Sequence, residues 1–82
     1  MNILITGGAG FIGSELGKFL LKEGHNVKIL DNLEYGYREN FEDNENLKKS
    51  FIFADIREEN FLQYLQDVDV VYHFAGISSL PE

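Results

Sequence analysis

Short, mostly apolar runs alternate along this chain with segments of helical periodicity. The runs cover residues 3–5, 27–30, 51–53 and 68–72. The first run is typical of a strand that is buried on both faces of a parallel sheet, and the other three runs predict further strands. Between the first two runs, apolar side chains recur at helical spacing opposite Glu and Lys side chains, which predicts an amphipathic helix. Its apolar positions are Phe11, Ile12, Leu16, Phe19 and Leu20.

The second half of the chain is less regular. Residues 32–49 contain five acidic side chains against one arginine before two lysines at the end, and have no clear apolar period, which predicts a solvated loop with a short helix. Phe61, Leu62 and Leu65 are spaced as one face of a further helix, and we expect Phe51, Phe53 and Phe61 to lie in the core. The order strand, helix, strand, loop, strand, helix, strand predicts a parallel α/β sheet. Right-handed crossovers favour a doubly wound arrangement with strand order 3-2-1-4.

Length, charge and cysteine content narrow the function classes. Eighty-two residues make one domain at most, and a net charge of −7 argues against nucleic acid or an anionic membrane as the main partner. The sequence has no cysteine, which excludes disulfides and thiolate metal sites. The apolar runs are too short to span a bilayer, and the first residues lack the pattern of a signal peptide. We expect a cytoplasmic protein without a metal site.

A glycine-rich segment links the first predicted strand to the first predicted helix. Within residues 6–13, Gly8, Gly10 and Gly13 satisfy the pattern G-x-G-x-x-G, and Gly7, Gly10 and Gly13 satisfy G-x-x-G-x-x-G. Glycines allow the sharp turn and let the backbone approach a pyrophosphate, whose oxygens accept from the amides at the helix N-terminus. The segment therefore predicts a dinucleotide site, and a simple tight turn between strand and helix is the alternative.

Asp31 ends the second predicted strand, 21 residues after Gly10. An acidic residue at this place accepts hydrogen bonds from the adenosine ribose hydroxyls and repels a 2′-phosphate, which favours NAD over NADP. Arg38 lies further along the chain and could bind a phosphate, so NADP stays an alternative cofactor. The alternative role for Asp31 is that of an aspartate that caps a helix or forms a turn.

Two glycines are expected to differ in their tolerance of a side chain. A methyl group at Gly10 would push the pyrophosphate away or force the backbone into a disfavoured region. We therefore expect Gly10→Ala to abolish or weaken dinucleotide binding while the strands and helices persist. Gly36→Ala is expected to do much less.

Four stretches taken together resemble the extended short-chain dehydrogenase/reductase family, in particular its NAD-dependent nucleotide-sugar epimerases and dehydratases. They are the glycine segment, Asp31-Asn32-Leu33, Asp55-Ile56-Arg57 and His73-Phe74-Ala75-Gly76, the last being similar to the UDP-glucose 4-epimerase branch of the family. The resemblance implies a Rossmann NAD-binding domain, of which residues 1–82 are the N-terminal half. It also implies a parent enzyme that acts on a nucleotide sugar through a 4-keto-sugar intermediate and forms a homodimer through regions outside this chain.

The resemblance also implies roles for individual residues. The backbone amides of Phe11 and Ile12 would meet the pyrophosphate, and Asp31 would hold the adenosine ribose together with its neighbour. The adenine would lie on Asp55 and the residue after it, and the final loop would run beside the cofactor toward the nicotinamide and the substrate. The full set of implied cofactor residues is Gly7, Gly10, Phe11, Ile12, Asp31, Asn32, Leu33, Gly36, Asp55, Ile56, Phe74, Ala75, Gly76 and Ser78.

Catalysis in this family uses a Tyr-x-x-x-Lys pair, and none of the four tyrosines here is followed by Lys at the fourth position. We therefore expect the chain to be the cofactor-binding part of a longer enzyme, without a catalytic residue of its own and inactive alone. His73 is expected to be packed beside its strand and not catalytic. Two alternatives stay open: another extended short-chain reductase or dehydrogenase, and a non-catalytic nucleotide-sensing module.

Overall fold

The chain forms a four-stranded parallel sheet with the strand order β3-β2-β1-β4. The structure, a computed structural model, describes residues 1–34, 36–57 and 61–74. The strands are β1 (Asn2–Thr6), β2 (Asn26–Asp31), β3 (Phe51–Phe53) and β4 (Val70–His73). This order confirms the prediction made from the sequence of elements. The two central strands, β1 and β2, contain the fully buried residues Leu4, Ile5 and Ile29, as expected for strands covered on both faces.

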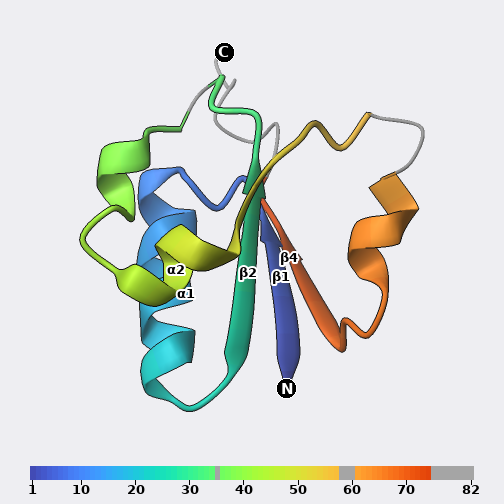
Figure 1. Ribbon diagram of the computed structural model, residues 1–82, viewed down its shortest axis with the longest axis horizontal. Helices are drawn as coiled ribbons and strands as arrows, with labels where there is room; N and C mark the ends of the chain where they lie inside the picture. The colour runs from blue at the N-terminus through green and yellow to red at the C-terminus, as the bar shows by residue number, and fades with distance from the viewer. Residues whose placement is uncertain (35, 58–60, 75–82) are drawn as a thin grey trace.

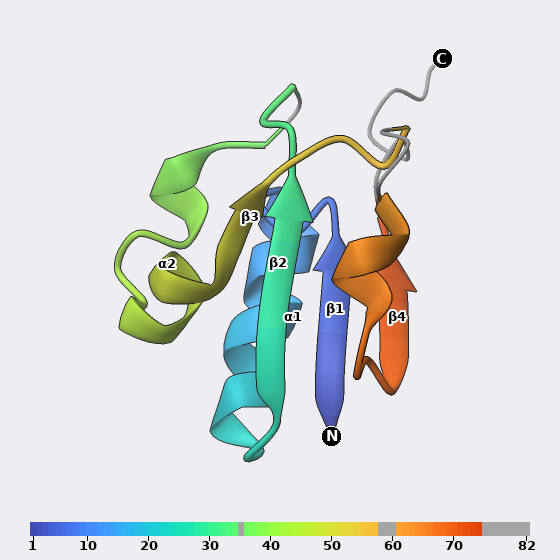
Figure 2. The same ribbon diagram turned by 45° about the vertical axis from the view of Figure 1, so that its right-hand side comes forward.

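Helices cover the two faces of this sheet unequally (Figures 1 and 2). The helix α1 (Phe11–Lys22) and the short helix α2 (Glu45–Ser50) lie on one face, and the 3₁₀ helix η2 (Phe61–Leu65) lies on the other. A second 3₁₀ turn, η1 (Arg38–Asn40), precedes α2. The chain thus changes face after β3, which is the doubly wound arrangement predicted from the sequence.

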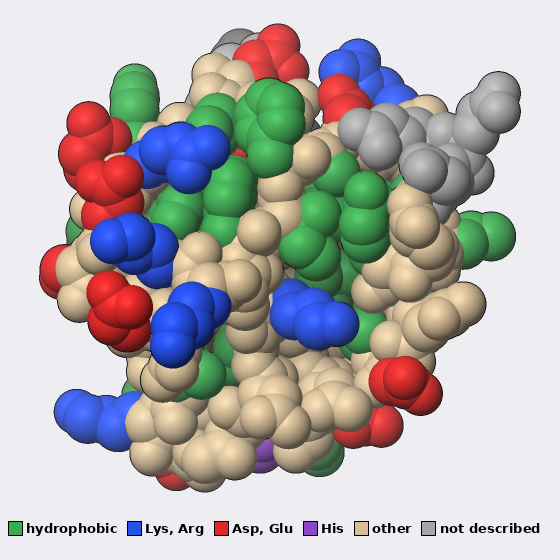
Figure 3. Space-filling view, in the orientation of Figure 1, with side chains coloured by type: hydrophobic (Ala, Val, Ile, Leu, Met, Phe, Trp, Pro, Cys, Tyr) green, Lys and Arg blue, Asp and Glu red, His purple; other side chains and the backbone are tan. Residues whose placement is uncertain are grey.

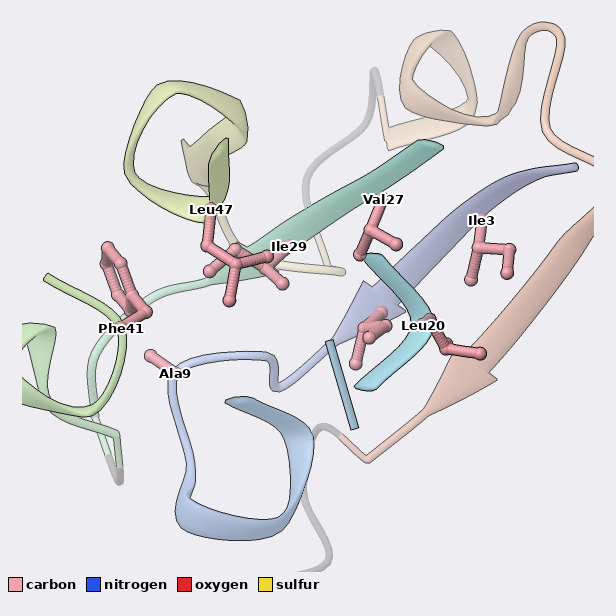
Figure 4. Close-up of a cluster of buried hydrophobic side chains, with 8 residues drawn as sticks. Ile3, Ala9, Leu20, Val27, Ile29, Phe41 and Leu47 are labelled. Carbon is pink, nitrogen blue, oxygen red and sulfur yellow. The ribbon is translucent and has the colours of Figure 1, made fainter. Parts of the chain in front are cut away.

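Two apolar clusters hold these layers together. The larger one lies between the sheet and the α1/α2 face, and Figure 4 shows its side chains converging from strands, helices and loops. Its buried members are Ile3, Ile5, Ala9, Leu20, Val27, Ile29, Phe41 and Leu47. The smaller cluster forms around Leu4, Leu30 and Ala54 under η2. The loop residue Phe41 is as buried as the strand residues, so the segment after β2 is tied to the core.

The helix α1 packs on the sheet through small residues, which corrects part of the predicted apolar face. Gly13, Ser14 and Gly17 are buried on this helix, whereas Phe11, Ile12 and Phe19 are 72%, 68% and 56% exposed. A Cβ atom on Gly17 would lie 3.3 Å from a methyl group of Leu47. The helix backbone therefore approaches its neighbours too closely for large side chains on that face. At the other end, Gly24 follows the helix in a left-handed conformation, with φ of 94°, which suits glycine.

The second half departs from the sequence predictions in three places. Leu62 is 72% exposed and does not share the packed face of Phe61 and Leu65 in η2. Phe53 is 65% exposed and is not a core residue, because β3 is a three-residue edge strand that pairs only through β2. The strand β4 begins at Val70, and Val68 packs under η2 against the smaller cluster. Asp67 just before it has a positive φ of 63°, so the chain turns between η2 and β4.

The surface over α1 and α2 mixes acidic and basic side chains (Figure 3). Lys18 forms ion pairs there with Glu15 at 3.6 Å and with Asp43 at 3.2 Å. Within the described residues, no helix is long and apolar enough to cross a membrane.

Candidate functional site

The parallel sheet brings the predicted site segments to one edge. The carboxyl ends of β1, β2 and β4 lie side by side, because Thr6 pairs with Leu30 on one side and with His73 on the other. The glycine segment leaves the end of β1, and the segments that contain Asp31 and Asp55 leave the ends of β2 and β3 at the same edge (Figure 1). Ligands of doubly wound sheets bind at this edge, where the strand order reverses.

The glycine loop makes a tight turn that needs glycine at defined places. Gly7 has a φ of 72°, which L side chains rarely adopt, and its N–H donates to the Leu30 carbonyl at 2.8 Å. A Cβ atom on Gly13 would lie only 2.6 Å from the Gly7 carbonyl oxygen. A Cβ atom on Gly8 would lie 2.5 Å from the Ile29 side chain. These three glycines are therefore required by the fold of the chain itself.

Gly10 differs from these glycines because the chain has room for a side chain at this position. Its φ of −73° and ψ of 167° are open to any residue. A Cβ atom would contact only the Gly7 carbonyl oxygen, at the ordinary distance of 3.4 Å. The expectation of a disfavoured backbone region at Gly10 was therefore wrong. A need for glycine here must come from something outside the chain, as the close approach of a ligand to the backbone would provide.

The N-terminus of α1 is open to an anion. Gly10 is its N-cap, and among the described residues no side chain caps this end and no acidic residue lies in the first turn. The first amides of Phe11 and Ile12, at the positive end of the helix dipole, therefore have no carboxylate of the first turn beside them. An uncapped helix end with a glycine at the N-cap fits a pyrophosphate.

Asp31 is buried and holds the glycine loop against the end of β2. Its side chain is 8% exposed, and one carboxylate oxygen accepts from the Ala9 N–H at 2.9 Å. The other oxygen accepts from the Leu33 N–H at 2.7 Å. Each oxygen has a second lone pair, so the carboxylate can still accept from a ligand hydroxyl. The acid thus connects the loop after β1 with the loop after β2, which the sequence argument did not anticipate.

The loop after β2 is strained and tightly packed. Leu33 has a φ of 62°, an uncommon conformation for a bulky residue. Gly36 is buried, and a Cβ atom there would lie 2.8 Å from the Ala9 backbone and 2.9 Å from an Asp31 oxygen. The expectation that Gly36 tolerates a side chain far better than Gly10 is therefore wrong for the fold. No local pattern in the sequence predicts this crowding at Gly36, because the contact joins residues of two different loops.

The carboxylate of Asp55, just after β3, lies among side-chain donors. Arg57 donates to it from its backbone N–H at 2.8 Å, from Nε at 2.9 Å and from a terminal guanidinium nitrogen. Asn32 donates to the second oxygen at 3.1 Å. The Arg57 hydrogen bonds hold the pKa of Asp55 well below its usual range, and this carboxylate raises the pKa of Arg57. Asn32 and Asp55 thus meet, as expected for two residues of one nucleotide site, while Ile56 packs on the smaller apolar cluster.

The far end of the predicted site is only partly described. The exposed ring of His73 has its Nδ1 atom 2.7 Å from the buried Thr6 hydroxyl, and the Phe74 N–H donates to the Thr6 carbonyl at 2.9 Å. His73 is therefore hydrogen-bonded at the end of its strand while the residue stays exposed. Ala75, Gly76 and Ser78 lie outside the described residues.

Three residues at this edge were missed by the sequence argument. Ala9 is fully buried between the two loops, and its carbonyl accepts from the Asn40 side chain at 2.7 Å. Arg57 is the main partner of Asp55. The short spacing of Asp55-Ile56-Arg57 is a signal that could have revealed this ion pair. Nothing local in the sequence pointed to Asn40, which lies in the acidic segment predicted to be a solvated loop.

The comparison with protein families matches residues 3–82 to the NAD dependent epimerase/dehydratase family. This match agrees with the resemblance, and the cofactor predicted from the glycine pattern and Asp31 is the one that the family uses. Two solved structures are similar in both sequence and fold. The UDP-N-acetylglucosamine 4-epimerase of Methanobrevibacter ruminantium, solved with UDP-N-acetylmuramic acid, is 38% identical with a TM-score of 0.81 over 98% of this chain and 26% of its own.

The second structure contains the cofactor. The UDP-glucose 4-epimerase of Thermus thermophilus, in complex with NAD, is 37% identical with a TM-score of 0.77 over 92% of this chain and 24% of its own. Among curated proteins, the UDP-glucose 4-epimerase of Halalkalibacterium halodurans is 40% identical over 85 aligned positions that include all of this chain. The chain spans about a quarter of the length of these relatives.

Proposed function

Because this chain belongs to the NAD dependent epimerase/dehydratase family, we propose that residues 1–82 form the first half of the NAD-binding domain of a nucleotide-sugar epimerase. The observation that carries the proposal is Gly10. The fold leaves space for a side chain at this position, yet the residue is a glycine at an uncapped helix N-terminus. The approach of a pyrophosphate to this backbone gives a reason for that glycine.

The cofactor residues inferred from the sequence fit this proposal. Phe11 and Ile12 offer their backbone amides to the pyrophosphate, and the remaining lone pairs of Asp31 face the ribose hydroxyls. A buried carboxylate at that place also disfavours a 2′-phosphate, which supports NAD over NADP. Asn32 and Asp55 form the adenosine end, where their side chains already meet. Gly7, Leu33, Gly36, Ile56 and Phe74 complete the described part of the proposed site.

In the whole protein, this half of the domain binds and orients the cofactor. When bound, NAD supplies a hydride acceptor, so that a sugar hydroxyl can be oxidised to a 4-keto sugar. An epimerase then returns the hydride to the opposite face of the sugar, whereas a dehydratase eliminates water first. The tyrosine and lysine that such chemistry uses have no matching pair in these 82 residues. We therefore assign binding to this chain and place proton transfer and sugar recognition elsewhere in the protein.

UDP-glucose and UDP-galactose are the substrates proposed first, because relatives that match the whole of this chain carry the name UDP-glucose 4-epimerase. We also propose a homodimer formed through other parts of the protein and a cytoplasmic location. The two alternatives are a reductase or dehydrogenase of the same superfamily and a nucleotide-sensing module without catalysis.

A single set of measurements on the whole protein separates these possibilities. Titration with NAD and with NADP, followed by calorimetry, should give clearly tighter binding of NAD. Incubation with UDP-galactose should then produce UDP-glucose, detected by chromatography. A protein that binds NAD and converts no UDP-sugar would be a sensor or would use another substrate. A protein that binds neither dinucleotide would contradict the proposed function.

A further inference from the structure

The segment after β2 reaches across the site and holds the middle of the glycine loop. The backbone of Ala9 is hydrogen-bonded on both sides to groups outside that loop. Its N–H donates to Asp31 at 2.9 Å, and its carbonyl accepts from the Tyr37 N–H at 3.0 Å and from the Asn40 side-chain amide at 2.7 Å. Ala9 is fully buried, so water cannot replace these partners.

The segment after β2 is itself packed on the core, which holds its hydrogen bonds to Ala9 in place. Phe41, next to Asn40, is 1% exposed and stacks on Phe51 with ring centroids 4.9 Å apart. Figure 4 shows Phe41 and Ala9 next to each other in the larger apolar cluster. Gly36, at the start of the segment, has no room for a side chain against Ala9. The segment is therefore fixed at both ends, with the Asn40 amide between them.

The position of Ala9 matters because Gly10 and the first turn of α1 follow it directly. A rotation of the peptide between Ala9 and Gly10 would move the carbonyl of Ala9 and turn the amide of Gly10 at the same time. The amides of Phe11 and Ile12 come next along the chain. Holding the Ala9 carbonyl thus fixes the direction in which these donors face a bound anion.

We propose that Asn40 is a positioning residue for the dinucleotide, which it orients through the Ala9 carbonyl without touching the cofactor. This inference rests on the proposed function, since it assumes that the glycine loop binds a pyrophosphate. A side-chain amide suits this task, because it donates a hydrogen bond and brings no charge near the phosphates. An ionised aspartate at position 40 could only accept hydrogen bonds. Its negative charge would face both the Ala9 carbonyl oxygen and the bound anion.

The test compares Asn40→Ala and Asn40→Asp with Asn44→Ala in the whole protein. Asn44 is a matched control, because its side chain caps α2 by accepting from the Leu47 N–H at 3.1 Å, away from the glycine loop. NAD affinity is measured by calorimetry, and thermal unfolding reports the stability of each variant. We expect Asn40→Ala to bind NAD roughly tenfold more weakly, the loss that one hydrogen bond to a buried carbonyl implies. Asn44→Ala should bind NAD like the wild type at a similar loss of stability.

The pH dependence separates positioning from a general loss of structure. Asn40→Asp should bind NAD more weakly than Asn40→Ala at pH 8, and its deficit relative to wild type should shrink as the pH falls to about 4, where an ordinary aspartate gains its proton. The other ionisable groups beside Ala9 and on the same turn are Asp31, Tyr37, Arg38 and Glu39. All of them are present in every variant, so the ratio to wild type isolates position 40.

The outcomes are distinct. Wild-type NAD affinity in Asn40→Ala, or equal losses of affinity in Asn40→Ala and Asn44→Ala, would overturn the positioning role. If Asn40→Ala fails to fold, the nearly isosteric Asn40→Asp variant still decides, and an affinity ratio independent of pH would count against the proposal. Failure of the wild-type protein to bind NAD would instead overturn the proposed function on which this inference rests.

Discussion

Asp31 and Asp55 stand at the ends of neighbouring strands, and their carboxylates are held differently. Asp31 is buried and accepts from the backbone N–H groups of Ala9 and Leu33. The Asp55 side chain is 24% exposed, and besides the Arg57 backbone N–H it accepts mainly from the Arg57 guanidinium, whose side chain is 78% exposed. Backbone donors are placed by the fold, whereas an exposed guanidinium can turn away. The β2 end of the site is thus formed by folding itself, and the β3 end depends on a side chain that a ligand can displace.

The largest effect is expected from Asp31→Ala, which tests the buried side of this comparison. The substitution leaves the buried N–H of Ala9 and the part-buried N–H of Leu33 without their acceptor, at an expected cost of about 2–4 kcal/mol in the free energy of unfolding. Urea titration followed by circular dichroism measures this cost. NAD affinity should fall by roughly one to two decades as well. An unfolding free energy equal to that of the wild type would show that the carboxylate does not hold the loops together.

Gly36→Ala is expected to have the next largest effect, since a methyl group at this position meets backbone atoms of Ala9 that cannot rotate away. Overpacking of this kind destabilises by about 1–3 kcal/mol. The melting temperature should fall, and NAD affinity should fall with it, because the glycine loop shifts. A variant with wild-type melting temperature would mean that the loop after β2 moves to accept the side chain.

Gly10→Ala should separate stability from binding. The backbone conformation suits alanine and the nearest atom to the new methyl group is at 3.4 Å, so the unfolding free energy should change by less than about 1 kcal/mol. NAD affinity should fall at least tenfold, roughly, because the methyl group occupies the space of the pyrophosphate. Calorimetry on the folded variant checks this. Unchanged NAD affinity would contradict the pyrophosphate role and would mean that the glycine loop is only a tight turn.

The smallest effect is expected from Arg57→Gln, which tests the exposed side. Loss of the guanidinium should return the pKa of Asp55 toward its usual range, measurable by NMR titration of the side-chain carboxyl carbon. Because the pKa of Asp55 is lowered in the folded protein, the pair stabilises the fold above about pH 4 and this contribution fades as the pH falls below that value. The stability difference between variant and wild type should therefore shrink in acid. Arg57→Lys is the control that keeps the charge but loses the paired donors.

The fold could be read from the sequence because its signals are local. Strand runs such as residues 27–30, the glycine turn and Gly24 at the end of α1 each depend on neighbours along the chain. The same reasoning failed for Phe11 and Phe53, which are exposed. Periodicity shows that a residue is apolar, but which face is buried depends on how closely the next layer approaches. On α1 that face belongs to Gly13 and Gly17.

For the site, the sequence by itself determined which residues reach the carboxyl edge of the sheet. Gly10, Asp31 and Asp55 follow strands whose parallel order follows from right-handed crossovers. Only the tertiary structure decided what each of them does there. Asn40 meets Ala9 across 31 positions of the chain, and Gly36 is required by a contact with that same residue. Such contacts depend on the distance between loops that pack on one core, and no pattern along the chain encodes that distance.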